Sequence, residues 1–149
     1  MNRGRRIAFD YGDVRIGVAI TDQDAILATA IENLDAKAEN LTQSISELLA
    51  EFEPLYIAVG YPQHLSGAPS AKSKSVESFC MLLRSISELP IYLVDERLTT
   101  VSAARSLRES GINAKNAKSK IDGAAAVAIL ESALSAEKSS GAPSKLVFS

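Results

Sequence analysis

The sequence has little cysteine and few aromatic residues. Cys80 is the only cysteine among 149 residues, so an intrachain disulfide and a zinc site built from cysteines are both excluded. Tryptophan is absent, and four Phe and four Tyr provide few rings on which unpaired bases could stack. Any recognition of nucleic acid would therefore depend on charge. Cys80 itself falls on the apolar stripe of an expected helix, which indicates packing rather than a nucleophile.

Long hydrophobic runs are also missing. No run approaches the roughly 20 residues that span a bilayer, and the basic start MNRGRR is not followed by the apolar segment of a signal peptide. We therefore expect a cytoplasmic protein without membrane contact. Its 46% hydrophobic and 23% charged residues are typical of a globular chain. We expect residues 1–137 to form a single domain and residues 138–149, rich in Ser, Gly, Pro and Lys, to form a flexible C-terminal tail.

Charge is distributed unevenly along the chain. The net charge is −2, but residues 22–53 hold eight acidic side chains against Lys37 alone. The rest of the chain therefore carries 15 basic and 10 acidic side chains. This distribution favours a nucleic-acid partner for the basic part, although a basic cluster is more often simply a solvated face.

The apolar patterns predict five strands and four helices. Alternation predicts a hairpin over residues 7–22 and a third antiparallel strand over 25–34, and unbroken apolar runs predict parallel strands over 55–60 and 91–94. Helical spacing predicts helices over 40–53, 70–89, 101–110 and 121–137, with a polar, basic loop over 112–120. The predicted fold class is α/β, a mixed five-stranded sheet in which an antiparallel three-strand meander joins parallel strands, with helices on both faces.

Three acidic residues stand where ligands gather in such a fold. Asp10 and Glu96 lie at strand ends, and Asp122 lies at the start of a helix. Together they would form an oxygen-rich site suited to Mg²⁺ or Mn²⁺, and two such ions can promote phosphodiester cleavage. Asp95 is a rival to Glu96, because neighbouring residues on a strand point to opposite faces and only one of them can join Asp10.

Each acid also has a structural interpretation. Asp10 could cap the turn that follows it, Glu96 could pair with Arg97 or Arg15, and Asp122 could complement its helix dipole. Taken singly, each structural role is at least as plausible as metal binding. The coincidence of all three is what favours a metal site.

Four stretches resemble one protein family. They are FDYGDVRIGVAITD, VGYPQHLSG, VDERLTTVSA and IDGAAAVAILESAL, and they cover nearly the whole chain. They resemble the YqgF family, also called RuvX, whose members are described as pre-16S rRNA nucleases or Holliday junction resolvase-like proteins. The resemblance implies an RNase H-like fold, a cytoplasmic location, Asp10, Glu96 and Asp122 as the metal-binding catalytic acids, and a role in maturing the 5′ end of pre-16S rRNA.

Basic and hydroxyl side chains near these acids are candidates for substrate binding. We assign Arg15, Arg97 and Lys120 to phosphate positioning, and Arg97 most firmly because it directly follows Glu96. Thr99 and Thr100 are possible helpers, but capping of the helix that follows is the stronger interpretation for both.

The sequence departs from the family pattern in two places. Asp13 and Val14 stand where the family usually has a small hydroxyl residue and Lys, and His64 replaces a typical aliphatic residue. A loop His is usually only solvated, so a role for His64 in substrate binding or leaving-group protonation is the less favoured alternative. These changes bear on substrate preference more than on metal binding.

Three functions compete at this stage. The first is a metal-dependent endonuclease that hydrolyses structured RNA, pre-16S rRNA, in ribosome biogenesis. The second is a Holliday junction resolvase that uses the same acids on branched DNA, and the third is a non-catalytic RNA-binding assembly factor. Both a monomer and a homodimer are compatible with the sequence, and a stable dimer would favour the resolvase.

Overall fold

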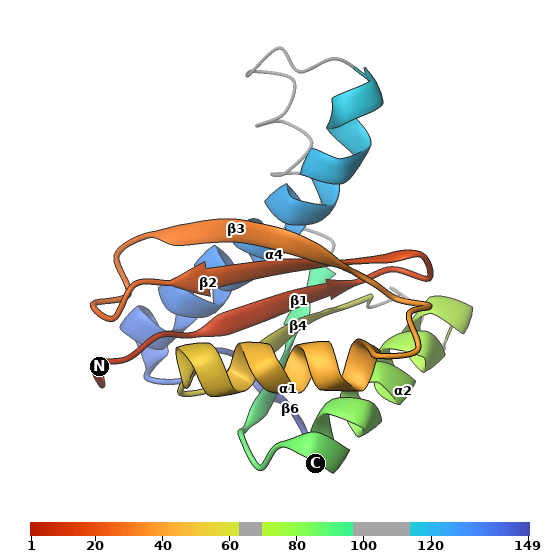
Figure 1. Cartoon of the computed structure of the whole chain (residues 1–149). Helices are drawn as coiled ribbons and strands as arrows, with labels where there is room; N and C mark the ends of the chain where they lie inside the picture. The colour runs from red at the N-terminus through yellow and green to blue at the C-terminus, as the bar shows by residue number, and fades with distance from the viewer. Residues whose placement is uncertain (63–69, 97–113) are drawn as a thin grey trace.

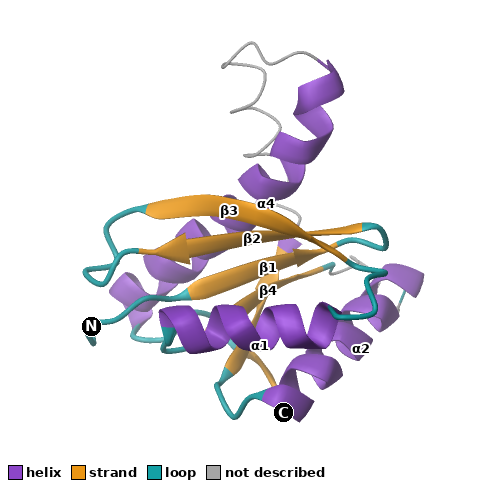
Figure 2. Cartoon of the chain, viewed as in Figure 1, coloured by secondary structure: helices purple, strands orange, loops and turns teal. Residues whose placement is uncertain are grey.

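The computed structural model describes residues 1–62, 70–96 and 114–149, with side chains from 123 onward in the last range. The described elements form a six-stranded sheet in the order β3-β2-β1-β4-β5-β6. The strands are β1 (Ile7–Tyr11), β2 (Arg15–Thr21), β3 (Ala28–Asp35), β4 (Ile57–Tyr61), β5 (Ile91–Asp95) and β6 (Leu146–Phe148), and the helices are α1 (Leu41–Phe52), α2 (Ala71–Ile86) and α4 (Ala114–Ser140). Helices α1 and α2 lie on one side of the sheet and α4 on the other (Figures 1 and 2).

Strand alternation divides the interior into two cores. In β1, Ile7 and Phe9 pack toward α1 and α2, whereas Ala8 packs toward α4. The α1 side is built from large aliphatic and aromatic side chains. The α4 side is rich in alanine from both the strands and the helix, so α4 lies close to the sheet. Helix α4 can therefore approach its face of the sheet more closely than α1 and α2 approach theirs.

The predicted meander is present. Strands β1 and β2 pair antiparallel, and β2 pairs antiparallel with β3, while β4 and β5 run parallel to β1. Gly12 in the first turn leaves no room for a side chain, because a Cβ there would lie 2.6 Å from the carbonyl oxygen of Arg15. The tight β1–β2 turn thus requires glycine at this position.

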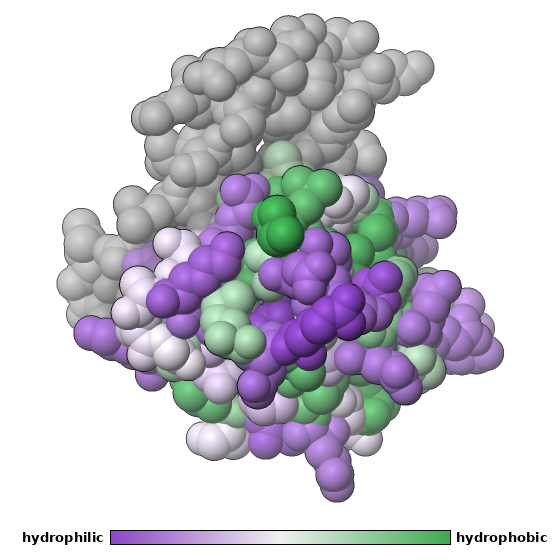
Figure 3. Space-filling view, turned by 90° about the vertical axis from the view of Figure 1, so that its left-hand side faces the viewer, coloured by the Kyte–Doolittle hydropathy of each residue, from purple (hydrophilic) through white to green (hydrophobic). Residues whose placement is uncertain are grey.

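The turn between β2 and β3 is fixed by Asp22. Its Oδ1 accepts hydrogen bonds from the backbone N–H groups of Ile26 (2.7 Å) and Leu27 (3.1 Å). These bonds hold the pKa of the Asp22 carboxyl below its usual value, because they stabilise the charged form. The Ile26 and Leu27 side chains are 77% and 66% exposed. Figure 3 shows this face of the molecule with hydrophilic side chains across its middle and hydrophobic side chains above them, along the right-hand side and at the lower edge.

Local signals explain the ends of α1 and α2. Helix α1 ends at Phe52; the capping residue Glu53 adopts the left-handed conformation, and Pro54 follows it. Helix α2 begins with a capping box between Ser70 and Ser73, whose side chains each accept from the other's backbone N–H. Cys80 is fully buried on α2, and burial raises the pKa of its thiol to about 12, so the interpretation as packing material is confirmed.

Helix α4 begins earlier than the pattern predicts. It starts at Ala114, so the prediction of a loop over 112–120 is wrong for residues 114–120, which are helical. The stretch lacks the apolar periodicity that marks a packed helix, but Ala and Lys are strong helix formers and no Gly or Pro interrupts them. The amino-terminal part of α4 projects past the β3 edge of the sheet (Figure 1).

The last residues of the chain also differ from expectation. Residues 138–149 were expected as a flexible tail, yet α4 continues to Ser140 and Leu146–Phe148 forms β6 beside β5. Ser144 Oγ donates to the carbonyl of Leu93, and Arg84 donates to the carbonyl of Phe148. The sheet therefore has six strands rather than five. Within the described residues, no helix is long and apolar enough to cross a membrane.

A buried ion pair ties the start of the chain to the end of α4. Arg6 is fully buried, and its Nη2 lies 2.9 Å from Oε2 of Glu137. Tyr56 donates its hydroxyl hydrogen to Oε1 of the same carboxylate at 3.0 Å. Burial, followed by the neighbouring negative charge of Glu137, raises the pKa of Tyr56 above its usual value. This network anchors the end of α4 against the residues that immediately precede β1 and β4.

Candidate active site

Asp10 lies on the α4 side of the sheet. It is the fourth residue of β1, and Ala8, two residues earlier, packs in the α4-side core. Its cross-strand partner on β2 is Gly17. On β4, Val59 pairs with the residue before Asp10, so Gly60 lies beside Asp10. The two strands next to Asp10 therefore place glycines, and no side chains, beside it on this face.

The strand register puts Asp95 and Glu96 on opposite faces of the sheet. Asp95 pairs with Tyr61, which packs in the α1-side core, so Asp95 points to the α1 side. Val94 packs in the α4-side core, and Glu96 follows it by two residues. The Oε1 atom of Glu96 lies 3.6 Å from where a Cβ on Gly60 would be. Glu96, and not Asp95, therefore shares the face of Asp10.

Asp122 lies within α4, but its side chain is outside the described residues. Helix α4 lies close to the sheet at Gly123, where a Cβ would lie 3.2 Å from the Cβ of Ala30 on β3. Ala125 and Ala126, three and four residues after Asp122, are buried. The structure thus gives Asp122 a position on the helix that covers the Asp10 face, while its contact with the other acids stays a prediction.

The predicted substrate-binding residues are only partly described. Arg15 stands on β2 in register with Asp35, and the alternation from Gly17 puts it on the same face as Asp10. Lys120 lies in α4 rather than in a loop, and its side chain is outside the described residues. Four further residues of the prediction fall outside the described part of the chain, namely Arg97, Thr99, Thr100 and His64.

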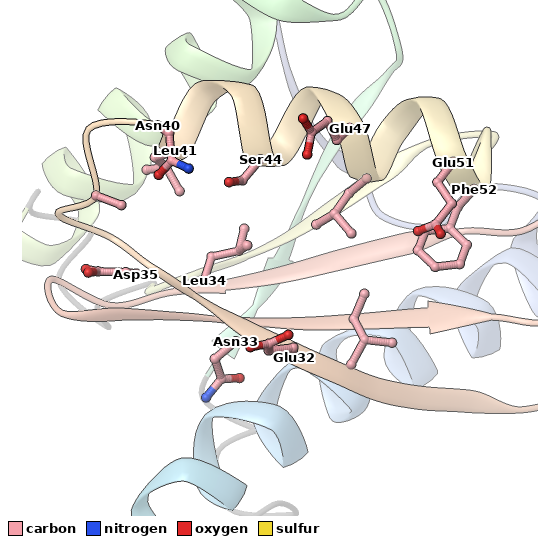
Figure 4. Close-up of a pocket in the computed structure, with 13 residues that line it drawn as sticks. Glu32, Asn33, Leu34, Asp35, Asn40, Leu41, Ser44, Glu47, Glu51 and Phe52 are labelled. Carbon is pink, nitrogen blue, oxygen red and sulfur yellow. The ribbon is translucent and has the colours of Figure 1, made fainter.

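Sequence reasoning did not single out Gly60. A Cβ on Gly60 would lie 2.6 Å from Cδ1 of Ile129, so the residue is small because α4 approaches closely. The sequence feature that could have identified Gly60 is its position at the end of the apolar run LYIAVG. Also missed was an irregularity opposite Gly17, where Glu32 and Asn33 of β3 fall between the paired residues. Figure 4 shows the Asn33 side chain on the side of β3 away from α1.

The described donors fit a hard divalent cation. Asp10 and Glu96 supply carboxylate oxygens on one face, and Gly60 adds no side chain between them. Among the residues with described side chains, no three His, Cys, Asp or Glu form a group that could hold a metal ion. A third protein ligand would therefore have to come from outside that set, as the prediction for Asp122 requires.

Comparison with known proteins identifies the family to which the chain is similar. The family model "RuvX: Holliday junction resolvase" matches residues 4–136. Relatives with the name "Putative pre-16S rRNA nuclease" include one from Streptomyces coelicolor, 45% identical over 145 residues (96% of this chain, 87% of the relative), and one from Cutibacterium acnes, 43% identical over 132 residues (88% and 82%).

Solved structures show the same fold. "T. thermophilus RuvC in complex with Holliday junction substrate" superposes with a TM-score of 0.58 at 16% identity, covering 91% of this chain and 96% of that chain. A second Thermus thermophilus RuvC structure gives a TM-score of 0.53 at 16% identity, covering 90% and 96%. At this identity the likeness concerns the fold alone, and it confirms the predicted RNase H-like α/β class.

Proposed function

The chain belongs to the RuvX family, also called YqgF, and we propose that it is a nuclease that matures the 5′ end of pre-16S rRNA during ribosome biogenesis. Its relatives have the name "Putative pre-16S rRNA nuclease" and align over nearly the whole chain. The observation that carries the proposal is the position of the Glu96 carboxylate over Gly60, on the same face as Asp10. The activity would be that of a cytoplasmic endonuclease.

The proposal includes Mg²⁺ or Mn²⁺ as cofactor, with two ions. Asp10, Glu96 and Asp122 would hold them, since carboxylates are the preferred protein ligands of both metals. When bound, the ions would supply Lewis-acid activation of water and neutralise charge on the leaving oxygen. Asp122 precedes Ala125 and Ala126 by three and four residues, the spacing of one helix face, and this supports its assignment.

The chain's own side chains would orient the substrate. Asp10 would hold the ions together with Glu96 and Asp122. Arg15, on the face of Asp10, would bind a phosphate next to the scissile bond. Arg97 and Lys120 are proposed to hold flanking phosphates, with Thr99 and Thr100 as hydrogen-bond donors.

The first experiment compares cleavage of a pre-16S rRNA leader and a four-way DNA junction, in the presence of Mg²⁺ or Mn²⁺. Asp10→Asn and Glu96→Gln are expected to lower the rate at least about 100-fold, because each removes a metal ligand. Asp95→Asn is the matched control, since it lies next to Glu96 but points to the α1 side. It should cut the leader at close to the wild-type rate.

Each of the other results would lead to a different conclusion. Preferential cutting of the junction would identify a resolvase instead of an rRNA nuclease. Equal cutting by wild type and Asp10→Asn would show a contaminating activity. If neither protein cuts but both bind the leader, the chain acts as an RNA-binding assembly factor and the catalytic proposal fails.

A further inference from the structure

A groove of about 720 Å³ runs between β3 and α1. It lies on the α1 side of the sheet, so the sheet separates it from the face that carries Asp10 and Glu96. Within the described part of the chain, β3 pairs only with β2 and forms one edge of the sheet. Figure 4 shows the groove open between the α1 helix and the β3 strand. Its position allows a ligand to bind there without blocking the candidate active site.

The floor of the groove is apolar. Ile31 and Leu34 contribute from β3, and Leu41, Leu48 and Phe52 contribute from α1. These side chains are only half-buried, although they pack against the main core. Burying the remaining apolar surface would favour binding of a partner by roughly 25 cal/mol per Å². The groove therefore offers a hydrophobic surface that a bound chain could cover.

The rim of the groove is acidic. Glu47 and Glu51 line it from the helix and Glu32 and Asp35 from the strand, and none of its described lining residues is basic. Two basic residues lie next to it: Arg15 stands opposite Asp35 in the strand register, and Arg5 lies over the Phe52 ring. The ion pairs Arg3–Asp24 and Arg6–Glu137 do not involve a rim carboxylate. Figure 4 shows Glu47 and Glu51 on the turns of α1 above the groove.

Such a rim costs stability in the free protein. Glu47 and Glu51 are four residues apart on α1, where two like charges repel by a few tenths of a kcal/mol. Gln43 Nε2 donates a hydrogen bond to Oε1 of Glu47 at 3.1 Å, which offsets part of this repulsion. The same charge disfavours nucleic acid and favours a cationic ligand. The polarity of the groove is thus opposite to that expected of a surface that binds RNA.

We propose that the groove binds an extended segment of a partner protein that carries alternating basic and apolar residues. From Leu41 to Phe52, α1 rises by about 17 Å, which an extended chain spans in five or six residues. Apolar side chains of the segment would cover the floor, while Lys or Arg side chains reach the carboxylates of Glu47 and Glu51 on the α1 rim. This site goes beyond the nuclease function and does not depend on it.

The test uses a fluorescein-labelled peptide of alternating Val and Lys, and anisotropy as the readout. The Val-Lys peptide should bind wild type saturably and more weakly as salt is raised. In the double variant Glu47→Gln/Glu51→Gln, the Kd should rise at least about five-fold. The matched control is Glu88→Gln/Glu131→Gln, which removes the same charge from exposed positions outside the groove and should change the Kd less than about two-fold.

Three results would overturn the proposal. A Ser-Lys peptide of the same charge that binds as tightly would show that the apolar floor takes no part. Equal weakening by both double variants would show binding to net charge rather than to the groove. Self-association of the wild type that only Glu47→Gln/Glu51→Gln abolishes would assign the groove to a second copy of the chain.

Discussion

At the residue scale, the pair of Arg6 and Glu137 is the feature most sensitive to substitution. Arg6 is 0% exposed and Glu137 only 13%, so removing the carboxylate leaves a buried guanidinium without its counter-charge. Glu137→Ala should lower the free energy of unfolding by about 3 kcal/mol in urea denaturation. Glu131→Ala, on the exposed side of the same helix, should change it by less than about 0.5 kcal/mol. Similar losses for both variants would contradict this account.

The sequence predicted part, but not all, of the arrangement of the candidate acidic residues. Strand alternation predicted that only one of Asp95 and Glu96 could join Asp10, but choosing between them required the register of β5 against β4. That register depends on contacts between strands about thirty residues apart in the chain, which no local pattern encodes. The role of Asp122 stays a prediction, because it depends on a side chain outside the described residues.

At the element scale, the approach of α4 to β4 sets the geometry around Glu96. Gly60→Ala would place a Cβ 2.6 Å from Cδ1 of the fully buried Ile129, so we expect a loss of about 1–3 kcal/mol in unfolding free energy. Ile129→Val removes the clashing methyl and alone costs about 1 kcal/mol. The double variant should therefore lose less than the sum of the two single losses. Strict additivity in this cycle would show that the helix does not press on Gly60.

Strong periodicity made most elements predictable, and its absence explains the exceptions. The meander, α1 and α2 each combine an apolar pattern with a local stop or cap, such as Pro54 or Ser70. The first turns of α4 carry no apolar stripe in the sequence, and they extend past the sheet (Figure 1). Strand β6 spans only Leu146–Phe148, which is too short for alternation to reveal.

At the scale of the whole molecule, the sheet separates two acidic regions with different expected ligands. Asp10 and Glu96 lie on the α4 side and are proposed to hold Mg²⁺, while Glu47 and Glu51 line the groove on the α1 side. A ligand that binds only the folded state stabilises it by about 2.7 kcal/mol at one hundred times its Kd. Mg²⁺ at constant ionic strength should therefore raise the Tm of the wild-type protein.

Variants on the two sides separate a specific metal site from general attraction of cations to acidic surface. Asp10→Asn should abolish the rise in Tm with Mg²⁺, because it removes a ligand, whereas Glu47→Gln/Glu51→Gln should retain the full rise. Differential scanning fluorimetry with a Mg²⁺ titration measures both variants against wild type. A rise that persists in Asp10→Asn but disappears in the groove variant would place the cation on the α1 side. It would thereby remove the support for a metal-dependent reaction at Asp10 and Glu96.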